Sequence, residues 1–86
     1  MPVKEIITCP QIASGQAPLS QATRFGNLLF VAGCTGRHPT TGAVGKDIKE
    51  QTAFALQRIQ MILETAGSSL DNVLTNTCYV TRREDL

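Results

Sequence analysis

Continuous and alternating runs of apolar residues predict three strands in the first part of the chain. The β-branched run from Val3 to Cys9 stops at Pro10 and predicts the first strand. Residues 20–24 predict a second, less periodic strand, and residues 25–27 (Phe-Gly-Asn) predict a hairpin turn, because Gly and Asn tolerate positive φ. The apolar run from Leu28 to Gly33 has the length of a strand that is covered on both faces.

A helical period replaces the β pattern after a loop that is rich in turn-forming residues. The loop covers residues 35–45, and its segment 39–42 (Pro-Thr-Thr-Gly) fits a type I turn. The helix is predicted to start at residue 46 or 47, to continue to residue 66, and to end on Gly67 as a left-handed cap. One apolar stripe of this helix is expected to face the sheet, formed by Ile48, Thr52, Ala55, Leu56, Ile59, Ile62, Leu63 and Ala66.

Two further apolar residues of the predicted helix, Phe54 and Met61, point roughly away from that stripe. They would pack against a second helix or meet another subunit. Isolated hydrophobic side chains are also common on protein surfaces, so the pattern leaves these alternatives open.

The end of the chain predicts a fourth strand and the beginning of another helix. Residues 73–80 alternate between two faces, which is typical of a strand. Thr81 and Glu84 have the spacing of a capping box, which has value only where a helix follows. The order β-β-β-α-β implies a right-handed crossover between parallel neighbours. We therefore expect residues 1–86 to form one α+β domain, a mixed sheet with helices on one face, that is incomplete at its C-terminus.

Composition indicates a globular protein without a strong charge. The chain has 86 residues, 42% of them hydrophobic and 17% charged, and a net charge of +1. Such a balance favours neither nucleic acid nor an anionic membrane as a partner. The first residues contain an acid and too short an apolar run for a signal peptide, and no run approaches the length of a membrane span. A cytoplasmic location is expected.

Three cysteines, Cys9, Cys34 and Cys78, are too widely spaced for a zinc site or a disulfide framework and suggest reduced thiols. Cys34 and His38 are the obvious nucleophile and base, since a thiolate needs such a partner. The spacing within a Pro-containing loop does not hold the two side chains together, however. A small apolar thiol is the preferred interpretation of Cys34. Cys34 and His38 do not complete a metal site, and residues 33–36 lack the spacing of a phosphate-binding loop.

Several blocks in a set order are more specific than any single residue. They are Pro-Leu-Ser-Gln-Ala at 18–22, Gly-Asn-Leu-Leu-Phe-Val-Ala-Gly at 26–33, Thr-Gly at 41–42, Gln-Thr at 51–52, Ala-Gly-Ser-Ser-Leu-Asp-Asn-Val at 66–73, and Tyr-Val-Thr at 79–81. In this order the chain resembles the Rid family, the YjgF-like reactive intermediate deaminases, also called the L-PSP endoribonuclease family. The resemblance covers nearly all of residues 15–86.

This resemblance implies a chorismate-mutase-like α+β fold that assembles as a homotrimer, with ligand clefts between subunits. It implies hydrolysis of enamines or imines such as 2-aminoacrylate to a 2-keto acid and ammonia, with no metal or organic cofactor. The family's carboxylate-binding arginine and its late glutamate correspond to no residue of this chain, so the catalytic residues are unknown. The cleft is expected to include Leu19, Ala32, Gly33 and Cys34, with Arg24, Arg37 and His38 near its mouth.

Two positions depart from the family pattern. The family often has Tyr where this chain has Leu19, and Ser where it has Ala32. Both changes remove a hydroxyl group from the cleft wall. A non-catalytic trimer that binds small carboxylates or other metabolites is therefore the alternative to a deaminase. A ribonuclease or translation inhibitor is less favoured, because RNA-binding surfaces are usually basic and rich in aromatic residues.

Overall fold

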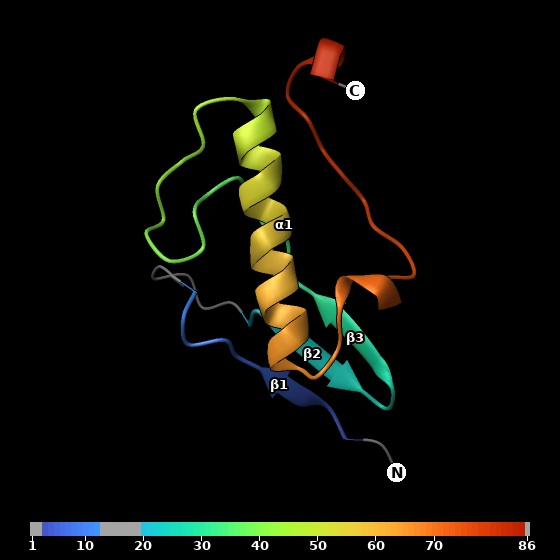
Figure 1. The fold of residues 1–86 in the computed structure, drawn as a ribbon. Coiled ribbons are helices and arrows are strands. Elements are labelled where there is room, and N and C mark those ends of the chain that lie inside the picture. The colour runs from blue at the N-terminus through green and yellow to red at the C-terminus, as the bar shows by residue number, and fades with distance from the viewer. Residues whose placement is uncertain (1–2, 13–19, 86) are drawn as a thin grey trace.

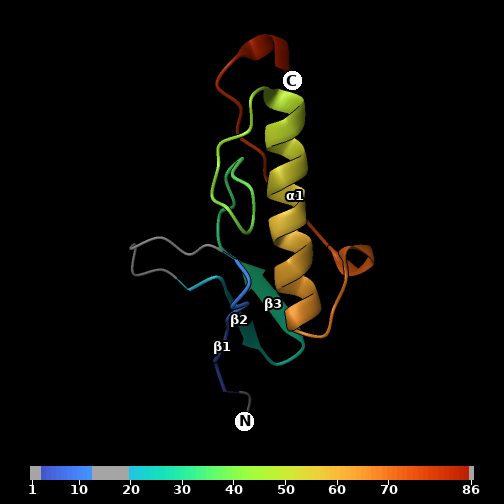
Figure 2. The ribbon, with the colours of Figure 1, turned by 60° about the vertical axis from the view of Figure 1, so that its left-hand side comes forward.

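The computed structural model describes residues 3–12 and 20–85 and shows a small sheet crossed by one long helix (Figure 1). The strands are β1 (Glu5–Ile7), β2 (Ala22–Phe25) and β3 (Leu28–Val31), in the order β1-β2-β3. Both pairings are antiparallel. The helix α1 (Ile48–Thr65) lies across one face of this sheet and extends well beyond it (Figures 1 and 2). The chain is thus α+β, as expected.

The β2–β3 hairpin forms where the sequence predicts it. Gly26 occupies the turn with φ of 63°, a conformation that costs glycine little and most other residues much more. The register pairs Phe25 with Leu28 and Ala22 with Val31. The strands are shorter than predicted, because the backbone pairs only over residues 5–7, 22–25 and 28–31.

Both ends of α1 confirm the sequence prediction. Asp47 is the N-cap, and its Oδ1 accepts a hydrogen bond from the Glu50 amide at 2.8 Å. The Glu50 carboxylate in turn accepts from the Lys46 amide at 3.0 Å. At the other end, Gly67 has φ of 83°, and its amide donates to the Glu64 carbonyl at 3.0 Å. Local chemistry therefore defines where this helix begins and ends.

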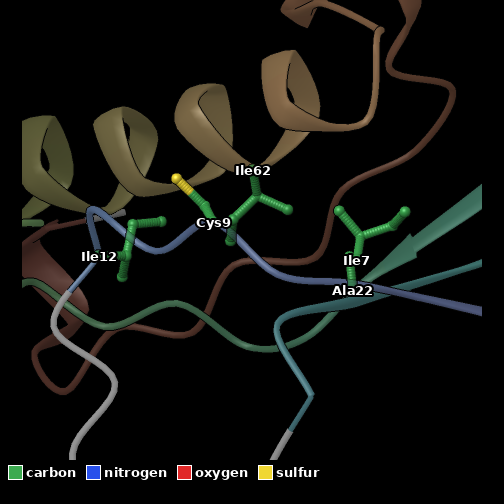
Figure 3. Packing of buried hydrophobic residues seen from close by; sticks show 5 residues of the cluster. All are labelled: Ile7, Cys9, Ile12, Ala22 and Ile62. Carbon is green, nitrogen blue, oxygen red and sulfur yellow. The ribbon is translucent and has the colours of Figure 1, made fainter.

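The core lies between the sheet and the C-terminal half of α1 (Figure 3). Its buried members are Ile7, Cys9, Ile12, Ala22 and Ile62. Leu29 and Val31 of β3 pack against this cluster. Only the C-terminal part of the predicted apolar stripe is buried. Ile62 and Leu63 are buried, whereas Ile48 and Leu56 remain exposed, because the sheet does not reach the first half of the helix.

The outer face of the sheet is apolar and exposed. Side chains alternate between the two faces of a strand, so residues next to the buried Ile7 and Ala22 and the partly buried Leu29 and Val31 point outward. Ile6, Phe25, Leu28 and Phe30 are between 47% and 61% exposed. The prediction that residues 28–33 form a strand covered on both faces is thus wrong for the single chain. One face of β3 meets the core, and the described residues place nothing over the other.

Phe54 and Met61 are both partly covered within the chain. The Phe54 ring meets His38 edge to face, with ring centroids 5.2 Å apart, and Met61 packs against the core cluster. A second helix or subunit is not required to account for either residue.

Residues 73–80, predicted as a fourth strand, are not part of the described sheet. The segment is not assigned to any strand, and Leu74 and Tyr79 are 86% and 93% exposed. A strand needs a neighbour for its backbone N–H and C=O groups, and the described residues offer none here. The expected mixed sheet and right-handed crossover are therefore replaced by a purely antiparallel sheet. The predicted second helix is present only as a 3₁₀ turn, Arg83–Asp85.

Candidate functional site

The cleft residues inferred from sequence lie where the chain leaves β3 toward α1. Ala32 still belongs to the edge of the hairpin, since its amide donates to the Gln21 carbonyl at 3.0 Å. Ala32 and Gly33 are exposed, and Cys34 is half-buried. A Cβ atom built on Gly33 would meet no other atom within 4 Å. The fourth residue, Leu19, lies outside the described residues.

The Cβ side of Gly33 is open, because no described atom beyond its two chain neighbours lies within 4 Å of a Cβ placed there. The exit of β3 therefore presents open space to any molecule that approaches from outside.

The Cys34 thiol lies in a partly buried position next to the guanidinium of Arg58. Its Sγ donates a weak hydrogen bond to the Ala32 carbonyl at 3.6 Å, and its side chain also touches the core cluster. Burial raises the pKa of Cys34, while the charge and hydrogen bonding of Arg58 lower it by less. The thiol is consequently protonated at neutral pH and is not an activated nucleophile.

Cys34 and His38, which the sequence offers as a nucleophile and base, do not hydrogen-bond to each other. The His38 Nδ1 atom accepts hydrogen bonds from the amides of Thr40 and Thr41, at 3.3 and 3.2 Å. These bonds, with the contact to Phe54, hold the ring inside its own loop. His38 is thus a turn-stabilising residue, which agrees with the preferred interpretation of Cys34 as a small apolar thiol.

The loop after the site is held against α1 by Gln51. Gly45 donates its amide to the Gly36 carbonyl at 2.8 Å, and the Gln51 side chain donates to the Gly45 carbonyl at 2.9 Å. A Cβ atom on Gly36 would lie 2.3 Å from the Cβ of Gln51, and one on Gly45 would be 2.7 Å from the Gln51 amide nitrogen. Only glycine permits this approach. The contact fixes the direction in which the chain leaves β3.

Arg24 and Arg37 do not line the mouth of this site. Arg24 donates to the Ala66 carbonyl at the far end of α1 and lies 3.7 Å from the Glu5 carboxylate. A cation there is favourable, since the helix C-terminus carries a partial negative charge. Arg37 donates to the Gly42 carbonyl at 3.1 Å and closes its own loop. Both residues stabilise the fold.

Arg58 was missed by the sequence analysis. It follows Ala55 by three residues and precedes Ile62 by four, which places it at the border of the predicted apolar stripe, and the structure leaves it half-buried. This position was the available signal. Its partner could not be inferred, because the contact with Cys34 joins two segments that are distant in sequence.

Neither a metal-binding cluster nor a membrane-spanning helix is found among the described residues. Within residues 3–12 and 20–85, no three His, Cys, Asp or Glu side chains come together in a way that could hold a metal ion. Over the same described part of the chain, no helix combines the length and apolarity that crossing a bilayer requires.

The sequence of this chain is similar to one known protein family and to several of its members. Residues 11–86 match the family model described as Endoribonuclease L-PSP. The chain is 44% identical over 78 residues to a RutC family protein of Pyrococcus abyssi, covering 90% of this chain and 61% of that protein. It is 31% identical over 75 residues to Reactive Intermediate Deaminase A of Arabidopsis thaliana, covering 86% and 40%.

A solved structure supports the same relationship. A protein of the conserved Rid family from Yersinia pestis superimposes with a TM-score of 0.72 at 34% identity, over 80% of this chain and 56% of that one. The chain spans about three fifths of the length of the Pyrococcus relative.

Proposed function

The chain belongs to the Endoribonuclease L-PSP family, the group that also contains the Rid proteins, and we propose that it hydrolyses reactive enamines and imines such as 2-aminoacrylate. The products are a 2-keto acid and ammonia. The family match over residues 11–86 carries this proposal. A relative named Reactive Intermediate Deaminase A supports the reaction class.

The chemistry requires one water molecule and no redox partner. The enamine first takes a proton on carbon and becomes the imine. Water then adds to the C=N carbon, and the tetrahedral intermediate expels ammonia as the carbonyl forms. A protein accelerates such a reaction by holding the substrate and water in reactive geometry.

The exit of β3 is suited to receive a small substrate. Ala32 and Gly33 are exposed there, and the space next to Gly33 is free of other described atoms. Cys34, whose raised pKa keeps its thiol protonated at neutral pH, is proposed to line this space without acting as a nucleophile. Leu19 is proposed to complete the cleft by the family resemblance.

Binding without catalysis is the second candidate function. Leu19 and Ala32 lack the hydroxyl groups that the resembled family often has at these positions. Fewer polar groups would then orient a water molecule. A trimer that binds a small carboxylate or another metabolite fits these two residues better than an efficient hydrolase does.

Assembly as a homotrimer is also proposed. The apolar outer face of the sheet, formed by Ile6, Phe25, Leu28 and Phe30, supports it, because contiguous exposed apolar surfaces commonly mark interaction sites. Other copies of the chain are the proposed occupants of this face. The clefts would then lie between subunits.

The test of hydrolysis is keto-acid release above the spontaneous rate. 2-Aminoacrylate is generated in solution from serine by a dehydratase, and keto acid is followed while the purified protein is varied in concentration. Acceleration proportional to protein supports the hydrolase. Release at the spontaneous rate, together with measurable metabolite binding, would instead favour the non-catalytic function.

A matched pair of variants connects the activity to the site. Gly33→Leu should abolish the acceleration, because the new side chain fills the open space at the exit of β3. Gln57→Leu, on an exposed helix position, should leave it unchanged. Equal activity of both variants would show that the reaction occurs elsewhere.

A further inference from the structure

His38 holds the tip of the loop between β3 and α1 through a ring nitrogen that accepts hydrogen bonds. Its Nδ1 accepts from the backbone amides of Thr40 and Thr41, at 3.3 and 3.2 Å. Backbone N–H groups can only donate, so Nδ1 carries no hydrogen of its own here. In a neutral imidazole one nitrogen accepts and the other donates, whereas both nitrogens donate once the ring is charged. The closed tip therefore requires the neutral form of His38.

The backbone of His38 belongs to the same tip. Its amide donates to the Ala43 carbonyl at 2.8 Å, and its carbonyl accepts from the Gly42 amide at 2.9 Å. Asn and Asp side chains commonly accept from backbone amides two or three residues ahead, and the imidazole takes that place in this loop. Imidazole differs from them because it is the side chain that normally changes its charge between about pH 5 and 8.

Within residues 3–12 and 20–85, His38 takes part in no ion pair. The charged neighbour on its own loop is Arg37, whose guanidinium closes the same tip. On α1 the ring meets Phe54, and the charged residues that line the surface hollow beside Phe54 are Lys46, Asp47, Lys49 and Glu50. The two acids among them already accept hydrogen bonds from backbone amides at the start of α1. A proton on His38 would thus add a second cation beside Arg37.

We propose that His38 is a proton-sensitive latch for the loop over residues 35–45, closed while the ring is neutral and released when it is protonated. A protonated Nδ1 would direct its N–H group at two other N–H groups, so both hydrogen bonds are lost. The unfolded tip binds this proton more readily than the closed tip does. The closed tip should therefore become less stable as the pH falls through the range in which imidazole is protonated.

The latch would also regulate the proposed cleft at the exit of β3. Gly33 and Cys34 lead directly into this loop, which lies beside the first half of α1 and is held there by Gln51 (Figure 2). A released tip would loosen the segment that sets the direction of the chain after Gly33. This consequence for the cleft rests on the proposed function, whereas the latch itself follows from the hydrogen bonds of His38.

NMR spectroscopy of the purified protein tests the latch directly. The chain has a single histidine, so every imidazole signal in a pH titration belongs to His38. At pH 7.5 the ring nitrogen shifts should show a proton on Nε2 and none on Nδ1. Between pH 7.5 and 5, the Thr40 and Thr41 amides should lose roughly tenfold of their protection from hydrogen exchange, after correction for the intrinsic rates, which is the worth of two ordinary hydrogen bonds.

Three variants separate the acceptor from the charge. His38→Asn supplies an oxygen that can accept from the same amides without titrating, so protection should be equal at both pH values. His38→Phe retains an aromatic ring beside Phe54 but no acceptor, and protection should be low at both. Gln57→His, added to His38→Asn, restores a titrating histidine at an exposed helix position and should not restore the pH dependence. Circular dichroism establishes that each variant is folded.

The latch is overturned if the protection of Thr40 and Thr41 in the unsubstituted protein does not change with pH. It is also overturned if protection increases at pH 5, which would mean that the Phe54 ring stabilises the charged imidazole. An equal pH dependence in His38→Asn would assign the effect to another group.

The effect on the cleft is measured separately, by keto-acid release from 2-aminoacrylate. Acceleration by the unsubstituted protein should decrease relative to His38→Asn as the pH falls from 7.5 to 5. Equal pH profiles of two active proteins would overturn the regulation of the cleft. Release at the spontaneous rate by both proteins would contradict the proposed hydrolysis alone, because hydrogen exchange decides on the latch without any activity.

Discussion

Both faces of the three-stranded sheet carry apolar side chains, but one face is buried and the other is exposed. The inner face, with Ile7 and Ala22, is buried against Ile62 of α1. The outer face, with Ile6 and Phe30, is equally apolar but remains exposed in the single chain. The difference shows that apolar character specifies a surface that must be covered, whereas connectivity decides which partner covers it. Here α1 reaches one face only.

The largest expected effect concerns the inner face. Ile62→Ala removes a side chain that is 3% exposed, so it should lower the free energy of unfolding by about 2–5 kcal/mol. Leu74→Ala, at an 86% exposed position, should change it by less than about 0.5 kcal/mol. Urea unfolding followed by circular dichroism measures both. Similar losses for the two variants would mean that the helix–sheet core is not the main source of stability.

The outer face is tested by oligomeric state. Phe30→Glu places a charge on this face and should dissociate the proposed trimer, because burying a Phe side chain is worth about 1.5–3 kcal/mol in each subunit. Gln57→Glu adds the same charge at an exposed helix position and should leave the assembly intact. Sedimentation velocity distinguishes the species. A Phe30→Glu protein that sediments like the unsubstituted one would show that copies of the chain do not cover this face.

A third comparison separates two glycines near the site. Gly36→Ala should cost about 1–3 kcal/mol, because the added Cβ would lie 2.3 Å from the Cβ of Gln51. Gly33→Ala meets no atom within 4 Å and should be nearly neutral. Thermal unfolding measures the difference between them. If Gly36→Ala were also neutral, the loop would not be held tightly against α1.

The smallest effect concerns two thiols. Alkylation requires the thiolate, so the raised pKa of the partly buried Cys34 should make it react more slowly at pH 7–8 than the exposed Cys78. Because the folded protein holds this proton more tightly than the unfolded chain does, stability should decrease as the pH rises above the ordinary thiol pKa of about 8.5. Mass spectrometry of iodoacetamide-treated protein gives both rates. Faster reaction at Cys34 would contradict its desolvation.

Sequence reasoning succeeded where the causes are local. Asp47 and Gly67 define α1 through hydrogen bonds within a few residues, and Gly26 allows the hairpin turn. The family resemblance was likewise carried by short blocks, and the comparison over residues 11–86 confirmed it. The candidate cleft residues Ala32, Gly33 and Cys34 lie together, as neighbours in sequence must. Their functional role stays a prediction.

The sequence by itself determined the helix, its caps, the hairpin and the α+β class, because each depends on residues that are close along the chain. Only the tertiary structure decided that residues 73–80 remain unpaired, that His38 contacts Phe54 and that Arg58 lies beside Cys34. Each of these depends on which distant segments meet. Local periodicity shows which secondary structure a segment favours and which of its faces is apolar. The contacts between segments depend on how the whole chain is connected and packed.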